Sequence, residues 1–92
     1  MTIDLSASPL YPEGARTAIV NLTVTNTRAP NTGGYVSVHP CGQPAANSNL
    51  NFTSGDQRAA TLLAPLDSDG HTCLTVIGQI ALIVDLAGWI SN

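Results

Sequence analysis

The sequence predicts an all-β domain, an antiparallel β-sandwich of about seven strands with an immunoglobulin-like or jelly-roll-like arrangement. Apolar and polar residues alternate with a period of two along most of the chain. Clusters of Gly, Pro, Asn and Asp separate these runs at intervals of about 8–12 residues. No window carries the apolar stripe of an amphipathic helix. Because 92 residues suit one such sandwich, residues 1–92 are expected to form a single domain.

The first four expected strands follow from this alternation, and they lie at residues 2–6, 17–26, 34–39 and 48–53. In the second, the apolar residues at positions 18, 20, 22 and 24 alternate with a mostly polar face. In the third, Tyr35 shares the outward parity of Ser37 and His39. In the fourth, Phe52 alternates with polar neighbours and is expected in the core.

The last three expected strands lie at residues 58–64, 71–77 and 80–87. Leu74 and Val76 form the inward face of the sixth. The seventh is apolar almost throughout, so we expect it in the middle of a sheet, covered on both faces. Asp85 interrupts this run and is costly to bury unpaired, so it must reach solvent, a backbone N–H group or an arginine.

The composition excludes several classes of protein. Charged residues make up only 10% of the chain, against about 25% in an average soluble protein, and ten Thr, seven Ser and seven Asn supply the polarity. Three Arg, no Lys and a net charge of −3 exclude a nucleic-acid binder that works by neutralising phosphates. No membrane insertion is expected, because the longest apolar stretch, residues 80–90, is shorter than the roughly 20 residues of a spanning helix.

Five segments together resemble a known family. In chain order they are AIVNLTVTN (18–26), GYVSVHPCG (34–42), SNLNF (48–52), DGHTCL (69–74) and LIVDLAGW (82–89). They resemble a β-sandwich repeat-type domain of secreted actinobacterial proteins, which occurs in tandem or appended to secreted hydrolases and surface proteins and has no assigned chemistry. The resemblance implies this fold and a secreted or cell-surface location. Two departures are visible: Trp89 stands where the family more often ends in Tyr-Phe, and the usual arginine-containing lead-in is absent.

Cys41 and Cys73 each follow a histidine by two residues, His39 and His71. Two Cys and two His could form a tetrahedral zinc site, and free thiols are a further alternative. In the extracellular compartment that the resemblance implies, we expect a disulfide instead. No metal and no other cofactor is expected.

Five residues are candidates for ligand binding: Tyr11, Tyr35, Trp89, Asp56 and Arg58. The three aromatic residues could stack on sugar rings, as coplanar aromatic residues do in carbohydrate-binding sandwiches. The two charged residues lie near one hairpin end and could supply polar contacts, although a solvated turn explains them as well.

No catalytic motif is present: the chain has no Gly-x-Ser-x-Gly elbow, Gly-rich phosphate loop or His-Glu-x-x-His sequence. We therefore expect no enzyme. The run Asp67-Ser68-Asp69-Gly70 resembles part of a calcium loop, but position twelve from Asp67 is Gly78 rather than a glutamate. A β-turn is the simpler interpretation, and calcium binding is left open.

Two functions remain. The first is a non-catalytic binding, adhesion or spacer module of a secreted or cell-surface bacterial protein, with a cell-surface glycan as candidate ligand and a protein or neighbouring domain as partner. The alternative is a structural assembly component that pairs through β-edges in an extracellular particle, such as a toxin or phage structural domain. Strand edges without Lys favour this alternative, because they are poorly protected against pairing.

Overall fold

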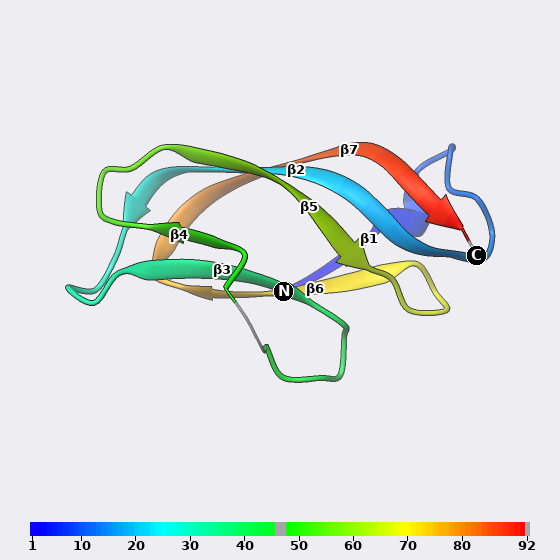
Figure 1. Ribbon diagram of the computed structural model, residues 1–92, viewed down its shortest axis with the longest axis horizontal. Coiled ribbons are helices and arrows are strands. Elements are labelled where there is room, and N and C mark those ends of the chain that lie inside the picture. Colours follow the sequence, from blue (N-terminus) through cyan, green and yellow to red (C-terminus); the bar gives the residue numbers. More distant parts are fainter. Residues whose placement is uncertain (46–47, 92) are drawn as a thin grey trace.

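Two antiparallel sheets stack against each other in this protein (Figure 1). The computed structural model describes residues 1–45 and 48–91. Its elements are β1 (Thr2–Asp4), the 3-10 turn η1 (Leu5–Ala7), β2 (Ala15–Arg28), β3 (Gly34–His39), β4 (Leu50–Phe52), β5 (Arg58–Pro65), β6 (His71–Ile77) and β7 (Gln79–Ser91). One sheet has the order β1-β6-β3-β4 and the other β5-β2-β7, which confirms the predicted sandwich. Within the described residues, no helix is long and apolar enough to cross a membrane.

The strand order keeps the central pairs of an immunoglobulin-like arrangement, whereas β1, β4 and β7 each lie in the opposite sheet from the corresponding strand of a constant-type immunoglobulin domain. The pairs β2–β5 and β3–β6 correspond to the central B–E and C–F pairs of that arrangement. In an immunoglobulin domain the first strand shares a sheet with the second, and the last shares a sheet with the sixth. Here β1 pairs with β6 and β7 pairs with β2. Each terminal strand therefore lies in the sheet that the other would occupy.

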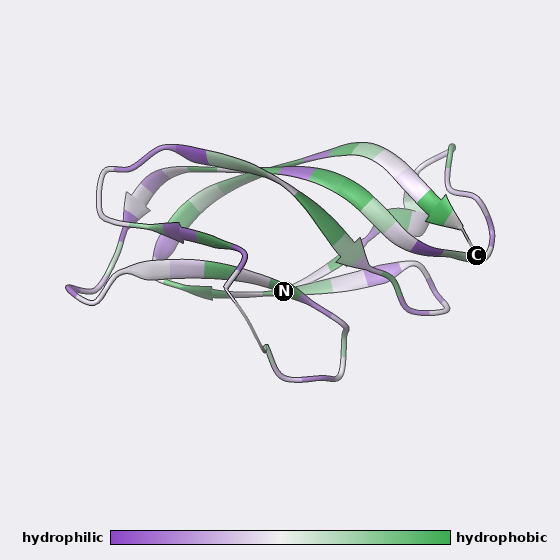
Figure 2. Ribbon diagram, in the orientation of Figure 1, coloured by the Kyte–Doolittle hydropathy of each residue, from purple (hydrophilic) through white to green (hydrophobic). Residues whose placement is uncertain are grey.

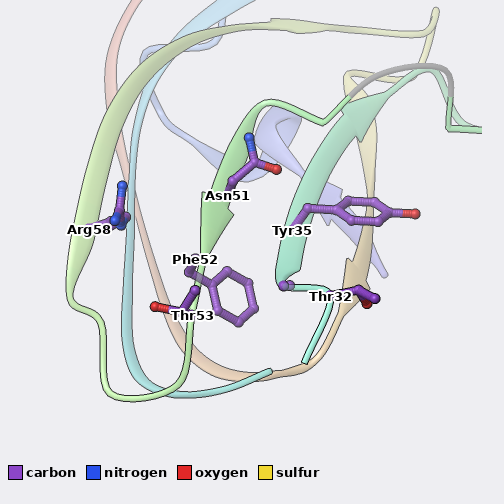
Figure 3. A pocket seen from close by; sticks show the side chains of 8 residues that line it. Thr32, Tyr35, Asn51, Phe52, Thr53 and Arg58 are labelled. Carbon is purple, nitrogen blue, oxygen red and sulfur yellow. The ribbon is translucent and has the colours of Figure 1, made fainter. Parts of the chain in front are cut away.

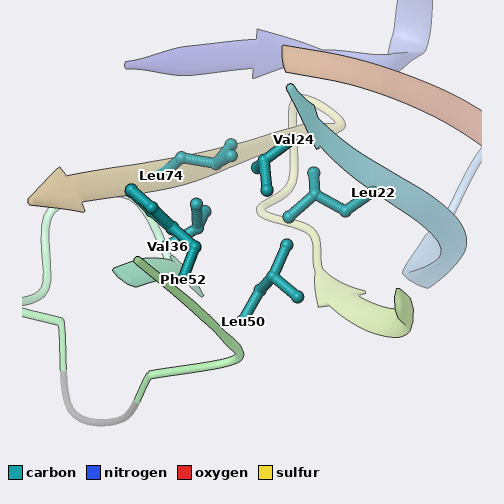
Figure 4. Packing of buried hydrophobic residues seen from close by; sticks show 6 residues of the cluster. All are labelled: Leu22, Val24, Val36, Leu50, Phe52 and Leu74. Carbon is teal, nitrogen blue, oxygen red and sulfur yellow. The ribbon is translucent and has the colours of Figure 1, made fainter. Parts of the chain in front are cut away.

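The core lies where the alternation of the sequence places it. Ala18, Val20, Leu22 and Val24 are all buried on one face of β2. The main cluster joins both sheets and consists of Leu22, Val24, Val36, Leu50, Phe52 and Leu74 (Figure 4). The expected core position of Phe52 is confirmed.

The expected central position of the last strand is wrong. Among the described residues, β7 pairs with β2 alone and therefore forms the edge of its sheet. Val84 contacts the core from one face of β7, whereas Ile83 on the other face is 51% exposed. The apolar run therefore reflects an inner face and an uncovered outer face rather than burial on both. Asp85 is exposed, so it reaches solvent directly.

The outer face of the β5-β2-β7 sheet is short of charge. In register, β2 contributes alternate residues such as Ile19 and Thr23, and β5 contributes Leu63. Leu63 and Ile83 are the most exposed large aliphatic side chains described in this sheet, and Figure 2 shows apolar residues along β5 and near the end of β7. This face is thus open, aliphatic and threonine-rich.

One residue of the predicted outward face is buried. Ser37 lies between Tyr35 and His39 in β3, both of which are only half-buried. Ser37 itself is fully buried, and its hydroxyl has no hydrogen-bond partner among the described residues. The residues of β3 therefore alternate between its two faces as expected, but the outer face is buried at its central residue, Ser37.

Candidate functional site

A shallow hollow lies where the edge strands of the two sheets meet, beside β3, β4 and β5 (Figure 3). Its volume is about 350 Å³. It is lined by Thr32, Gly33, Gly34, Tyr35, Asn51, Phe52, Thr53 and Arg58. Figure 3 shows Tyr35 and Arg58 on opposite sides of β4, so the hollow crosses this short strand. Two of the five predicted ligand-binding residues are therefore brought to one place.

Tyr35 supplies the aromatic surface of the hollow. Its cross-strand partners are Asn51 on β4 and Ile77 on β6. Because cross-strand partners lie on the same face of a sheet, the phenol ring has an amide on one side and an aliphatic side chain on the other. Tyr35 is half-buried, and Ile77 is 41% exposed. The phenol ring of Tyr35 and the amide of Asn51 therefore lie side by side on a face that is open to solvent.

Arg58 is oriented by an ion pair with Asp56. The Nε atom of Arg58 donates to Oδ2 of Asp56 over 3.1 Å. The same oxygen accepts from the backbone N–H (2.8 Å) and the hydroxyl (2.9 Å) of Thr53. The Thr53 N–H, then its hydroxyl, then Arg58 hold the pKa of Asp56 below its usual value. Asp56 is therefore an anion at neutral pH, and it holds one side of the guanidinium.

The loop that carries this ion pair is held in place by hydrogen bonds to Thr27. The buried Thr27 hydroxyl lies 2.7 Å from the carbonyl oxygen of Asp56 and 3.0 Å from that of Thr53. Gly55 donates its N–H to the carbonyl oxygen of Thr27 over 2.9 Å. These hydrogen bonds fix the backbone of the loop that carries Asp56. On its other side, Asp56 borders a second open hollow of about 570 Å³ beside Arg28.

Tyr11 and Trp89 do not reach the hollow. Their ring centroids are 5.4 Å apart and their planes meet at 74°, an edge-to-face contact. Trp89 pairs with Ala18 near the end of β7 and packs against a second, smaller core cluster of Ala18, Val20 and Ala64. Figure 1 shows this end of β7 beside the C-terminus. Two rings at this angle do not form one flat surface. A coplanar platform built from all three predicted aromatic residues is therefore absent from this arrangement.

The two cysteines form the expected disulfide. Cys41, just after β3, is bonded to Cys73 on β6. This rules out the zinc alternative, which needs both thiolates. His39 takes part in ordinary hydrogen bonds: its Nδ1 lies 3.0 Å from the carbonyl oxygen of Pro40, and its Nε2 lies 2.9 Å from the Thr75 hydroxyl. Since a carbonyl only accepts, Nδ1 carries the proton. The disulfide indicates a non-cytoplasmic, oxidising environment.

Residues 67–70 form the expected turn. Oδ1 of Asp67 accepts the backbone N–H groups of Asp69 (2.9 Å) and His71 (3.0 Å). These N–H groups, that of His71 first, hold the pKa of Asp67 below its usual value. Asp67, Asp69 and His71 offer possible metal-ligand atoms within 4.8 Å of one another. The carboxylate of Asp67 is nevertheless engaged in stabilising the turn.

Sequence reasoning missed three polar residues of the hollow: Thr32, Asn51 and Thr53. A signal was present for Asn51, because its parity in the strand is opposite to that of Leu50 and Phe52. No local pattern could show that Arg58, on the other sheet, lies across β4 from Tyr35.

Compared with known proteins, the chain matches no protein-family model, and no curated protein or solved structure is significantly similar to it. Its function is therefore inferred from the hollow and from the exposed strand edges.

Proposed function

We propose that this protein is a non-catalytic binding module of a secreted or cell-surface bacterial protein, and that the hollow beside Tyr35 binds a saccharide. One observation carries this proposal: the ring of Tyr35, the amide of Asn51 and the guanidinium of Arg58 all line one open hollow. The disulfide supports an extracellular location, since such bonds persist in oxidising compartments.

The chemistry of the lining suits a sugar ring. A pyranose has an apolar face that stacks on an aromatic ring and a rim of hydroxyl groups that need donors and acceptors. Tyr35 supplies the ring, and the amide of Asn51 both donates and accepts. The terminal nitrogens of Arg58 have no hydrogen-bond partner among the described residues, so they are free to donate to the ligand.

The same lining argues against glycoside cleavage. Hydrolysis of a glycosidic bond uses two carboxyl groups that flank it. None of the eight lining residues carries a carboxyl group, and neighbouring Asp56 is paired with Arg58. Binding without turnover is therefore the role that these side chains support.

A glycan array, followed by calorimetry with the best ligand, tests the proposal. Tyr35→Ala is expected to weaken binding about tenfold or more, because stacking is lost, whereas Tyr35→Phe keeps most of the affinity. Leu63→Ala, on the other sheet, is the matched control and should bind like the wild type. Absence of any saccharide binding, or equal binding by Tyr35→Ala and the wild type, would overturn the proposal.

A second candidate is a structural assembly component that pairs through β-edges. The observation that favours it is the 13-residue edge strand β7, whose outer edge forms no backbone hydrogen bond with another segment of residues 1–45 or 48–91. Size-exclusion chromatography with light scattering separates the candidates, because assembly requires a mass that rises with concentration. A constant monomer mass would reject the second candidate and leave the first intact.

A further inference from the structure

The four sheet edges of this protein are not equally protected. β1 and β4 have only three residues each. β5 begins at the cationic Arg58 and ends at Pro65, and charges and prolines are devices that discourage strand addition. β7 has 13 residues, contains no Pro, Lys or Arg, and carries one charge, Asp85. It is thus the edge most suited to accept another strand.

The inward-facing side chains of β7 are only partly covered. Leu82 and Val84 contact the core but are half-buried, and Leu86, with the same parity, is 36% exposed. On an edge strand, such residues lack a neighbour on one side. A further strand bearing aliphatic residues at matching positions would cover them and extend the core stripe.

β7 itself provides such a strand. The register with β2 places Ala87 in a bulge between Leu86 and Gly88, so the regular stretch before it ends at Leu86. From position 80 this stretch reads Ile-Ala-Leu-Ile-Val-Asp-Leu. Around Ile83 the pattern is nearly symmetric: the four inward positions, 80, 82, 84 and 86, are all aliphatic. An antiparallel pair of two such stretches matches aliphatic with aliphatic at all four inward positions.

The length of this stretch and its one charge together select the register, because only a pair centred on Ile83 matches all of residues 80–86. If Asp85 faced the Asp85 of a second copy, two like charges would lie directly opposite, which is destabilising. With Ile83 opposite Ile83 of the copy, Asp85 faces Ala81 instead. In this register Ile80 faces Leu86 and Leu82 faces Val84, and the bulge at Ala87 stays outside the paired stretch.

We propose that β7 pairs antiparallel with β7 of a second copy of this chain, about a two-fold axis at Ile83, to form a continuous sheet of the order β5-β2-β7-β7-β2-β5. The proposal rests on the second candidate function and names its partner and register. An antiparallel strand pair of identical chains is two-fold symmetric, which is the commonest symmetry of protein assemblies. The hollow beside Tyr35 lies on the other sheet and at its junction with β5, so both copies keep it free.

Light scattering from micromolar to millimolar protein concentration tests the association. The wild type is expected to pass from monomer to dimer. Ile83→Lys places two ammonium groups at the axis and should weaken the dimer about tenfold or more. Leu63→Lys is the matched control, because Leu63 is also an exposed aliphatic residue of the same sheet face but lies on β5, and it should dimerise like the wild type. A monomer at every concentration, or equal weakening by both variants, would overturn the proposal.

Disulfide trapping tests the register. Residues directly opposite in an antiparallel pair have Cα atoms about 4.5–5.5 Å apart, within reach of a disulfide. Ile83→Cys should therefore give a covalent dimer by non-reducing mass spectrometry. The two copies of Asp85→Cys would be offset by four residues, about 13 Å, and should not link. Cross-linking of Asp85→Cys but not of Ile83→Cys would contradict this register.

A Tyr35→Ala variant keeps the two proposals separate. It should dimerise like the wild type whether or not the hollow binds a saccharide, because its side chain lies away from β7. Loss of dimer in this variant would contradict pairing through β7.

Discussion

The ring of Phe52 lies directly against the backbone of Gly34, its cross-strand partner. A Cβ atom at position 34 would stand 2.5 Å from two carbons of this ring and 2.7 Å from the carbonyl oxygen of Ile77. The ring is part of the main core, so it has little room to move. Glycine at position 34 therefore permits the junction of β3, β4 and β6, on which the candidate site is built.

Gly34→Ala is expected to lower the free energy of unfolding by about 1–3 kcal/mol, because the added methyl overpacks the core against Phe52. Gly88→Ala is the control, since a Cβ atom there has no neighbour closer than 3.6 Å. Urea unfolding followed by tryptophan fluorescence measures both. Equal stability of the two variants would show that Phe52 does not confine position 34.

The disulfide should contribute about 3–4 kcal/mol to stability on the chain-entropy estimate, given a sequence separation of 32 residues. The double variant Cys41→Ala, Cys73→Ala is expected to unfold at correspondingly lower denaturant. The intact mass of the native protein should rise by about two daltons on reduction, as two S–H bonds replace one S–S bond. Two thiols that react with an alkylating agent in the native protein would contradict the bond.

Acid should destabilise the protein partly through Asp56. Its folded-state pKa lies below the unfolded value of 3.8, so its contribution is complete well above pH 3.8 and is lost as the pH falls through the folded-state pKa. Asp56→Asn is expected to lower stability at neutral pH and to flatten its decline below about pH 4. Unfolding by urea across this range measures the effect. If the free energy of unfolding of Asp56→Asn fell with pH as steeply as that of the wild type, Asp56 would not contribute to acid destabilisation.

Buried and exposed aliphatic residues should differ sharply in their contribution to the free energy of unfolding. Leu22 is 1% exposed in the main core, whereas Leu63 is 61% exposed on the outer face. Leu22→Ala is therefore expected to cost about 2–5 kcal/mol, through lost burial and a residual cavity. Leu63→Ala and Ile83→Ala should each cost much less, because their side chains are already largely hydrated. Comparable losses in thermal unfolding would contradict these burial assignments.

The period-two pattern alone determined the class of fold and the inward face of most strands. The expected bounds of β3 and β6 agree with the structure, because alternation and the flanking glycine, proline and aspartate turns are local properties of the chain. The core position of Phe52 follows in the same way. The disulfide followed from the compartment that the family resemblance implied, since only one pairing of two cysteines exists.

Tertiary structure decided which strands are neighbours. An apolar run such as that of β7 is compatible with a central strand or with an edge strand whose outer face is open, and only pairing with β2 alone distinguishes them. The burial of Ser37 and the meeting of Tyr35 with Arg58 depend likewise on segments far apart in the chain. Alternation records the face on which a side chain lies. The alternation does not show which strand will lie next to a given strand, because neighbouring strands are chosen by the long-range packing of the two sheets.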